Sequence, residues 1–95
     1  MNYADKAMND LRRLLPDCDD TLLRLYSLLV LTRGRRTTLK DVHDAWALNR
    51  TKTNSLHKSL VPFRQLDRKT QLLDKKYRDA IRKVARGYER WQEDE

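Results

Sequence analysis

The chain has 95 residues, with 21 lysines and arginines, 14 aspartates and glutamates, and a formal net charge of +7. This length allows one small domain with a modest core and excludes a large internal active site. No stretch reaches the ~18 consecutive apolar residues of a membrane span, and the single Cys18 cannot form an internal disulfide. We therefore expect one domain over residues 1–95 that is cytoplasmic and does not engage a membrane.

The excess positive charge belongs to the later part of the chain. Up to Gly34, five basic residues balance five acidic residues, whereas from Arg35 onward there are sixteen basic residues and nine acidic ones. Such a bias indicates an anionic partner, which would be a nucleic acid, a nucleotide or an acidic protein surface. The alternative is that the charge serves solubility alone.

The first two helices are predicted from apolar residues that recur at three- and four-residue steps. Residues 3–15 have this period, and Pro16 ends the helix. The second helix runs from about Thr21 to Arg33 and is apolar around most of its circumference, which is typical of a helix at the centre of a domain. Gly34 follows its last turn, as expected at a helix C-terminus.

A third helix is predicted to start at Thr38, because Asp41 stands three residues later in a weak form of the capping box. The polar residues 49–55 end this helix. The segment 55–63 carries a short apolar run that includes Pro62, which cannot donate a backbone hydrogen bond. We therefore expect an irregular loop there, with at most a short edge strand.

A last helix is predicted over residues 68–91, with Asp67 as its N-cap. One face is a continuous apolar seam, and another face carries a basic stripe. The seam consists of Leu73, Tyr77, Ala80, Ile81, Val84, Tyr88 and Trp91, and the stripe consists of Lys75, Arg78, Arg82 and Arg86. The sequence thus predicts an all-α fold, a small four-helix domain with one irregular loop.

The two histidines and Trp46 are the candidates for a functional site. A zinc site needs three or four ligands, and neither His43 nor His57 has suitable partners at helical spacing, so we expect no metal. Either histidine could act as a general base, but no nucleophile in a recognisable setting and no glycine-rich phosphate loop accompanies them. We therefore expect neither an enzyme nor a bound cofactor. The structural alternative is that both histidines hydrogen-bond the backbone of the 49–63 loop and hold it to the third helix.

Trp46 lies on the apolar face of the third helix and is either a core residue or a stacking platform for a base. With Arg50 one turn further on and His57 nearby, it would bind a nucleotide through stacking and charge.

The central stretch resembles the ryanodine-receptor repeat domain, the RyR domain. That family has a helix with His-x-x-Trp, then a histidine followed by an apolar-Pro-aromatic segment, then a leucine and a capped helix that contains an acidic residue. The matching residues here are His43-Asp44-Ala45-Trp46, His57 to Phe63, Leu66, Asp67 and Asp74. The resemblance covers about residues 39–84, and only ten residues separate Trp46 from His57, fewer than in the family.

This resemblance implies a compact helical module that binds without catalysis, and in bacteria such modules are proposed to sense nucleotide-like ligands. The chain is also similar to short proteins of actinobacteria and their phages. We expect a pocket between the third helix and the 55–63 loop that takes a nucleotide-like ligand or a host or phage protein. Its lining would be His43, Trp46, Arg50, His57 and Phe63.

Two other functions stay open on sequence grounds. The first is binding of nucleic acid by the basic stripe together with Arg35 and Arg36, which would be steeply salt-dependent. The second is self-association into a homodimer or an adaptor role, with Leu23, Leu28 and Leu31 of the second helix as an apolar seam.

Overall fold

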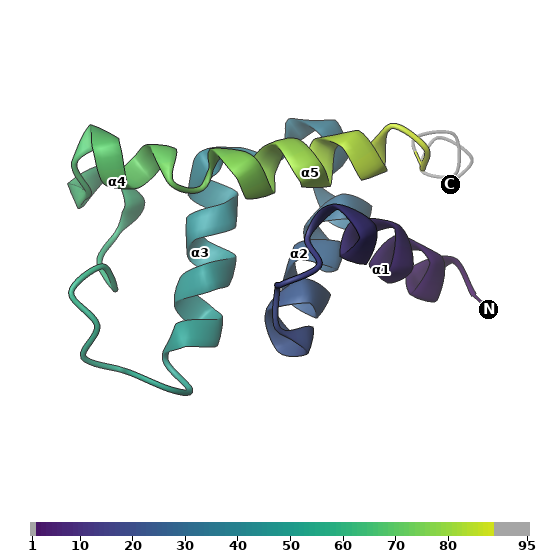
Figure 1. Cartoon of the computed structure of the whole chain (residues 1–95). Coiled ribbons are helices and arrows are strands. Elements are labelled where there is room, and N and C mark those ends of the chain that lie inside the picture. Colours follow the sequence, from purple (N-terminus) through teal and green to yellow (C-terminus); the bar gives the residue numbers. More distant parts are fainter. Residues whose placement is uncertain (1, 89–95) are drawn as a thin grey trace.

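The computed structural model describes residues 2–88, whose regular structure is entirely helical, with no strand. The predicted all-α fold with four helices is confirmed, and the last helix is divided into two. The elements are α1 (Tyr3–Leu14), α2 (Asp20–Thr32), α3 (Leu39–Arg50), α4 (Arg68–Leu72) and α5 (Lys75–Ala85), with the 3₁₀ turns η1 (Gly34–Arg36) and η2 (Phe63–Gln65). Figure 1 shows α5 running across one end of α2 and α3, with α1 on the side of α2 away from α3.

Side-chain caps fix where α2 and α3 begin. Asp19 accepts a hydrogen bond from the backbone N–H of Leu22 at 2.9 Å. The predicted capping box is present: Thr38 Oγ1 accepts from the N–H of Asp41 at 3.1 Å, and the Asp41 carboxylate accepts from the N–H of Thr38 at 2.9 Å. A cap of this kind contributes about 1 kcal/mol, so local sequence alone determines these two boundaries.

The tight turn between α2 and α3 depends on Gly34. Its φ is 59°, in the left-handed region that favours glycine. Thr37 is buried and closes the turn, because its hydroxyl donates to the Gly34 carbonyl at 2.7 Å and its N–H bonds to the same oxygen at 3.2 Å. Arg33 then pairs with Asp41 at 3.0 Å, which joins the end of α2 to the first turn of α3.

The expected single helix over residues 68–91 is interrupted, so this part of the prediction was wrong. The N–H groups of Leu73 and Asp74 bond to carbonyls three residues back, at 3.1 and 3.4 Å, and the backbone tightens into a 3₁₀ turn between α4 and α5. The cause is tertiary, because the Gln71 side-chain amide donates to the carbonyls of Phe63 at 3.1 Å and Leu66 at 3.2 Å. These bonds attach α4 to the segment before it, whereas α5 is attached to the hydrophobic core through its buried residues.

The interruption changes the predicted apolar seam. Leu73 is 68% exposed and lies outside the core, whereas Tyr77 packs against it and Ile81 is fully buried. Trp91, the last residue of the predicted seam, lies outside the described residues.

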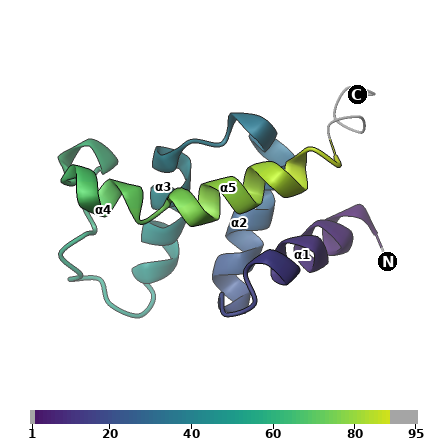
Figure 2. The same cartoon turned by 45° about the horizontal axis from the view of Figure 1, so that its top comes forward.

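The hydrophobic core forms where α5 packs against α1 and α2. Figure 2 shows α5 passing in front of α2. The largest fully buried apolar side chains of the core are Leu11, Tyr26, Val30, Val42 and Ile81. One or more of them comes from each of α1, α2, α3 and α5, so a single core holds the four helices together. The central position predicted for α2 is confirmed, because it contacts α1, α3 and α5.

Residues 51–62 form the predicted irregular loop, and no strand is found in it. The loop leaves the end of α3 and returns beside it to reach η2 (Figure 1). His43, which is 3% exposed, fastens it to α3 through a 2.7 Å hydrogen bond between its Nε2 and the Val61 carbonyl. The ring of Phe63 lies 6.0 Å from the His43 ring, so the apolar run of the loop packs directly onto α3.

Candidate functional site

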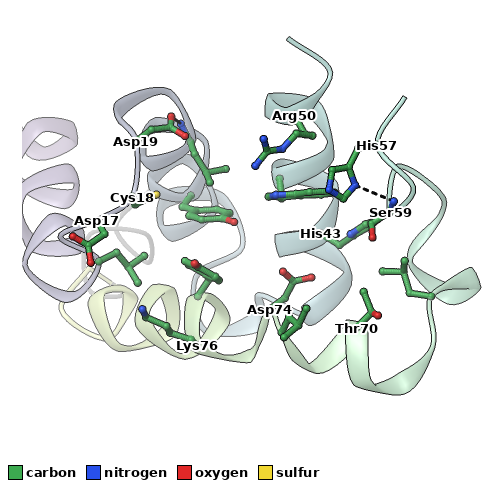
Figure 3. Close-up of a pocket in the computed structure, with 17 residues that line it drawn as sticks. Asp17, Cys18, Asp19, His43, Arg50, His57, Ser59, Thr70, Asp74 and Lys76 are labelled. Carbon is green, nitrogen blue, oxygen red and sulfur yellow. Dashed lines mark hydrogen bonds between the residues drawn. The ribbon is translucent and has the colours of Figure 1, made fainter. Parts of the chain in front are cut away.

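A cavity of about 540 Å³ lies between α2 and α3, and α4 and α5 form its floor. Its aromatic lining consists of Tyr26, His43, Trp46, His57 and Tyr77, and its charged lining of Asp17, Asp19, Arg50, Asp74 and Lys76. The remaining lining residues are Leu15, Cys18, Leu22, Ser59, Leu66, Thr70 and Leu73. Figure 3 shows Arg50 and Asp74 pointing into this space from opposite ends.

The cavity is displaced from the place where the sequence predicted a pocket. We expected it between the third helix and the 55–63 loop, where Val61 bonds directly to His43. The space is instead on the side of α3 that faces α2, with His57 and Ser59 contributed by the loop. Four of the five predicted lining residues line this cavity, and Phe63 does not.

One face of α3 supplies three of the predicted residues at spacings of three and four. The ring centroids of His43 and Trp46 are 5.6 Å apart with nearly parallel planes. The Arg50 guanidinium lies over the Trp46 ring, 5.6 Å from its centroid. Because residues three and four apart share one side of a helix, these groups form a continuous row from the floor of the cavity to its opposite end.

His43 combines a structural role with its place in the lining. The Val61 carbonyl can only accept a hydrogen bond, so Nε2 of His43 carries the proton that makes their 2.7 Å contact. This confirms, for His43, the alternative in which a histidine holds the loop to the third helix.

His57 is held differently. Its Nδ1 accepts from the backbone N–H of Ser59 at 3.0 Å, a bond within the loop itself. Its ring contacts Trp46 edge to face, with the centroids 5.2 Å apart. The loop therefore covers Trp46 from one side through this ring.

The ends of the cavity differ in charge. Among residues 2–88, neither the Arg50 guanidinium nor the Asp74 carboxylate has an ion pair or a hydrogen bond with another side chain. Burial raises the pKa of the Asp74 carboxyl, and the charge that His43 carries when protonated opposes this rise. Arg50 provides a cation at one end, where Asp19 lies on the opposite wall and caps α2, and Asp74 provides a carboxylate at the other end. These two groups suit a ligand with an anionic group and a hydrogen-bond donor at its two ends.

Cys18 also lines the cavity, but its thiol is not activated. Burial raises its pKa, and the neighbouring Asp19 carboxylate raises it further. Because the thiolate is the nucleophilic form, this environment disfavours covalent catalysis at Cys18.

The sequence analysis missed Asp74 as a lining residue, although a signal for it exists. Asp74 is three residues before Tyr77 and seven before Ile81, so it falls on the apolar side of the last helix. A carboxylate on a face that packs inward is unusual unless it has a partner. Tyr77 was expected in the apolar seam of the last helix. Its ring packs against that of Tyr26, with the centroids 5.4 Å apart, and both residues also line the cavity.

The residues of the predicted nucleic-acid surface do not form one unpaired stripe. Lys75 and Arg78 both pair with Asp79 at 3.0 Å. Arg82 donates from Nε to the Thr37 carbonyl at 2.8 Å and so ties α5 to the turn after η1. Arg35, Arg36 and Arg86 are exposed.

Arg82→Met should lower the free energy of unfolding by about 1–2 kcal/mol, since it removes a charge-assisted hydrogen bond to Thr37 but keeps most of the apolar stem. Urea denaturation measures this change. Lys83→Met is the matched control, because Lys83 is exposed on the same helix, and it should leave stability within about 0.5 kcal/mol. Equal effects of the two substitutions would contradict a structural role for Arg82.

The apolar seam predicted for self-association is largely covered within the domain. Leu23 is 3% exposed and Leu31 packs against the core, whereas Leu28 is 54% exposed.

Two features are absent from the part of the chain that the structure describes, residues 2–88. No helix there is long and apolar enough to cross a membrane. No group of three or more His, Cys, Asp or Glu side chains in the same range could hold a metal ion.

Residues 2–86 match the family DUF7701, which is described as a domain of unknown function. The match includes α1 and α2 as well as the segment from α3 onward, so both walls of the cavity belong to it. No curated protein and no solved structure matches the chain.

Proposed function

The chain belongs to the DUF7701 family, and we propose that it is a non-enzymatic binding module that takes a nucleotide-like ligand in the cavity between α2 and α3. The observation that carries this proposal is the Trp46 ring in the cavity lining, with the guanidinium of Arg50 beside it. Any of the bases can stack on an indole ring, because each has a flat aromatic face. A guanidinium without an ion-pair partner can bind a phosphate.

The size of the cavity supports a small ligand. At about 540 Å³ it falls within the ~300–1,000 Å³ of typical ligand sites. Its mixture of aromatic walls and a few charged groups is also what such sites contain.

The state of the one cysteine in the cavity lining supports binding without catalysis. The thiol of Cys18 keeps its proton at neutral pH, because its pKa is raised. His43 and His57 each use a ring nitrogen for a backbone contact of the loop.

The likeness of residues 39–84 to the RyR domain supports the same proposal. Three of the residues that carry it meet at one wall of the cavity, where Trp46 contacts both His43 and His57. The wall from α2 lies outside that likeness, so the proposed site includes residues that the resemblance does not cover.

Calorimetric titration with a panel of nucleoside monophosphates tests the proposal. One or more should bind, and Trp46→Leu should weaken that binding by roughly 5- to 150-fold, the loss expected for a stacked base. Leu48→Ala is the matched control on the same helix, because Leu48 is 63% exposed, and it should leave binding unchanged.

Thermal melting of each variant shows whether a loss of binding is a loss of fold. Binding that survives Trp46→Leu, or a wild-type protein that binds none of the nucleotides, would overturn the proposal. Binding only to duplex DNA, with steep salt dependence, would instead favour the exposed arginines as the site.

A further inference from the structure

Asp74 is placed in the cavity by the interruption between α4 and α5. The Gln71 side chain donates to the carbonyls of Phe63 and Leu66, and the helix is interrupted immediately afterwards. Asp74 stands in the N-cap position of α5 but makes no capping hydrogen bond with its side chain. Its carboxylate instead points into the cavity (Figure 3).

The groups around Asp74 favour a hydrogen-bond donor from a ligand. The nearby titratable groups are His43 from α3 and Tyr26 from α2, and neither is hydrogen-bonded to the Asp74 carboxylate. The Tyr26 side chain is 1% exposed, yet its hydroxyl has no hydrogen bond within residues 2–88. Burial and the charge of Asp74 raise the pKa of Tyr26, so the phenol keeps its proton and can donate.

A carboxylate and a phenol in the lining of one cavity match one base edge better than the others. Guanine presents a carbonyl oxygen, an N–H and an amino group in a row, so the phenol can donate to the oxygen while the carboxylate accepts from the two nitrogens. Adenine presents a bare ring nitrogen at the middle position, and its lone pair would face the carboxylate.

The opposite end of the cavity accommodates the phosphate. His43, at the Asp74 end, and Arg50 are seven residues apart on α3, a rise of about 10 Å. A ribose between a base at Asp74 and a phosphate at Arg50 bridges this span, with Trp46 beside the base between them. Asp19 lies on the opposite wall at the Arg50 end, where its carboxylate accepts from the N–H of Leu22 and the hydroxyl of Thr21 and so caps α2. Asp17 lies lower on that wall, away from Arg50.

From this arrangement we infer that the cavity prefers guanine nucleotides and that the Asp74 carboxylate determines this preference by accepting from the base edge. The inference rests on the proposed function. It assigns one base class and one specificity-determining residue to that site.

The test is calorimetric titration of the full chain with the 5′-monophosphates of guanosine, inosine, adenosine and xanthosine at one salt concentration. Guanosine monophosphate should bind tightest, and the inosine compound, which lacks the amino group, should bind at least about tenfold more weakly. Asp74→Asn should lose the guanine preference and favour xanthosine, because the asparagine amide can donate to the xanthine carbonyl that replaces the amino group.

Stability measurements distinguish a lost contact from a lost fold. Because the pKa of Asp74 is raised in the folded protein above the ordinary 3.8, the charged carboxylate opposes folding above that pH. Asp74→Asn should therefore match or exceed the wild-type melting temperature at pH 7, and the difference should disappear as the pH falls below 3.8, where both forms are neutral.

The outcomes separate the two proposals. Equal affinities for the four nucleotides, with binding still lost in Trp46→Leu, would overturn the role of Asp74 and leave the binding module intact. An unchanged guanine preference in folded Asp74→Asn would have the same meaning. No binding by the wild-type protein would overturn both.

Discussion

Ile81→Ala should lower the free energy of unfolding by about 2–5 kcal/mol, the range found when a large aliphatic side chain is deleted from a packed core. Ile81 is fully buried on α5, the helix that contacts α1, α2 and α3. Its removal leaves a cavity where these helices meet, and a chain of this size has no second core to compensate. Urea denaturation followed by circular dichroism measures the change.

Leu28→Ala is the matched control for Ile81→Ala. Both substitutions shorten an aliphatic side chain on a helix, but Leu28 is 54% exposed. Its replacement should change stability by no more than about 0.5 kcal/mol. If Leu28→Ala lowered the free energy of unfolding as much as Ile81→Ala, the exposed side of α2 would have to be covered by another molecule. That result would favour self-association.

His43→Ala should cost about 2–4 kcal/mol and should also release the loop over residues 51–62. The substitution removes the donor to the Val61 carbonyl and a buried ring that packs against Trp46 and Phe63. Lys52 and Lys58 lie in this loop, so trypsin should cleave it faster in the variant than in the wild-type protein.

His57→Ala is the matched control for His43→Ala, because it also removes a histidine but leaves the hydrogen bond that anchors the loop to α3. The His57 ring accepts a hydrogen bond from the N–H of Ser59 in the loop and contacts α3 through the Trp46 ring, without a hydrogen bond to that helix within residues 2–88. Its loss should therefore destabilise the protein less and leave the loop attached at Val61. Equal protease sensitivity of the two variants would contradict the role given to His43.

The parts of the fold that follow local rules could be predicted from the sequence. The periods of α1 and α2 and the box formed by Thr38 and Asp41 depend on residues within a few positions of one another. The division of the last helix could not be predicted, because it depends on Gln71 reaching carbonyls of a segment that has no regular structure in the sequence pattern. Helical propensity and period both favour a continuous helix there, and a tertiary contact overrides them.

Only those residues of the candidate site that lie on a single helix could be predicted to be neighbours. The row of His43, Trp46 and Arg50 follows from spacing along α3. The opposite wall comes from α2 and the turn before it, and the packing of α2 against α3 is not encoded in either segment alone. Asp74 lines the cavity at the break between α4 and α5, and the sequence pattern did not predict this break.

Mapping the ligand site by two-dimensional ¹H–¹⁵N NMR tests the central claim most directly. On titration with guanosine monophosphate, the Trp46 indole N–H and the backbone amides near Tyr26 and Asp74 should shift together and saturate. Shifts confined to the exposed Arg35, Arg36 and Arg86, with Trp46 unmoved, would show that the nucleotide meets only surface charge and would contradict a binding cavity between α2 and α3.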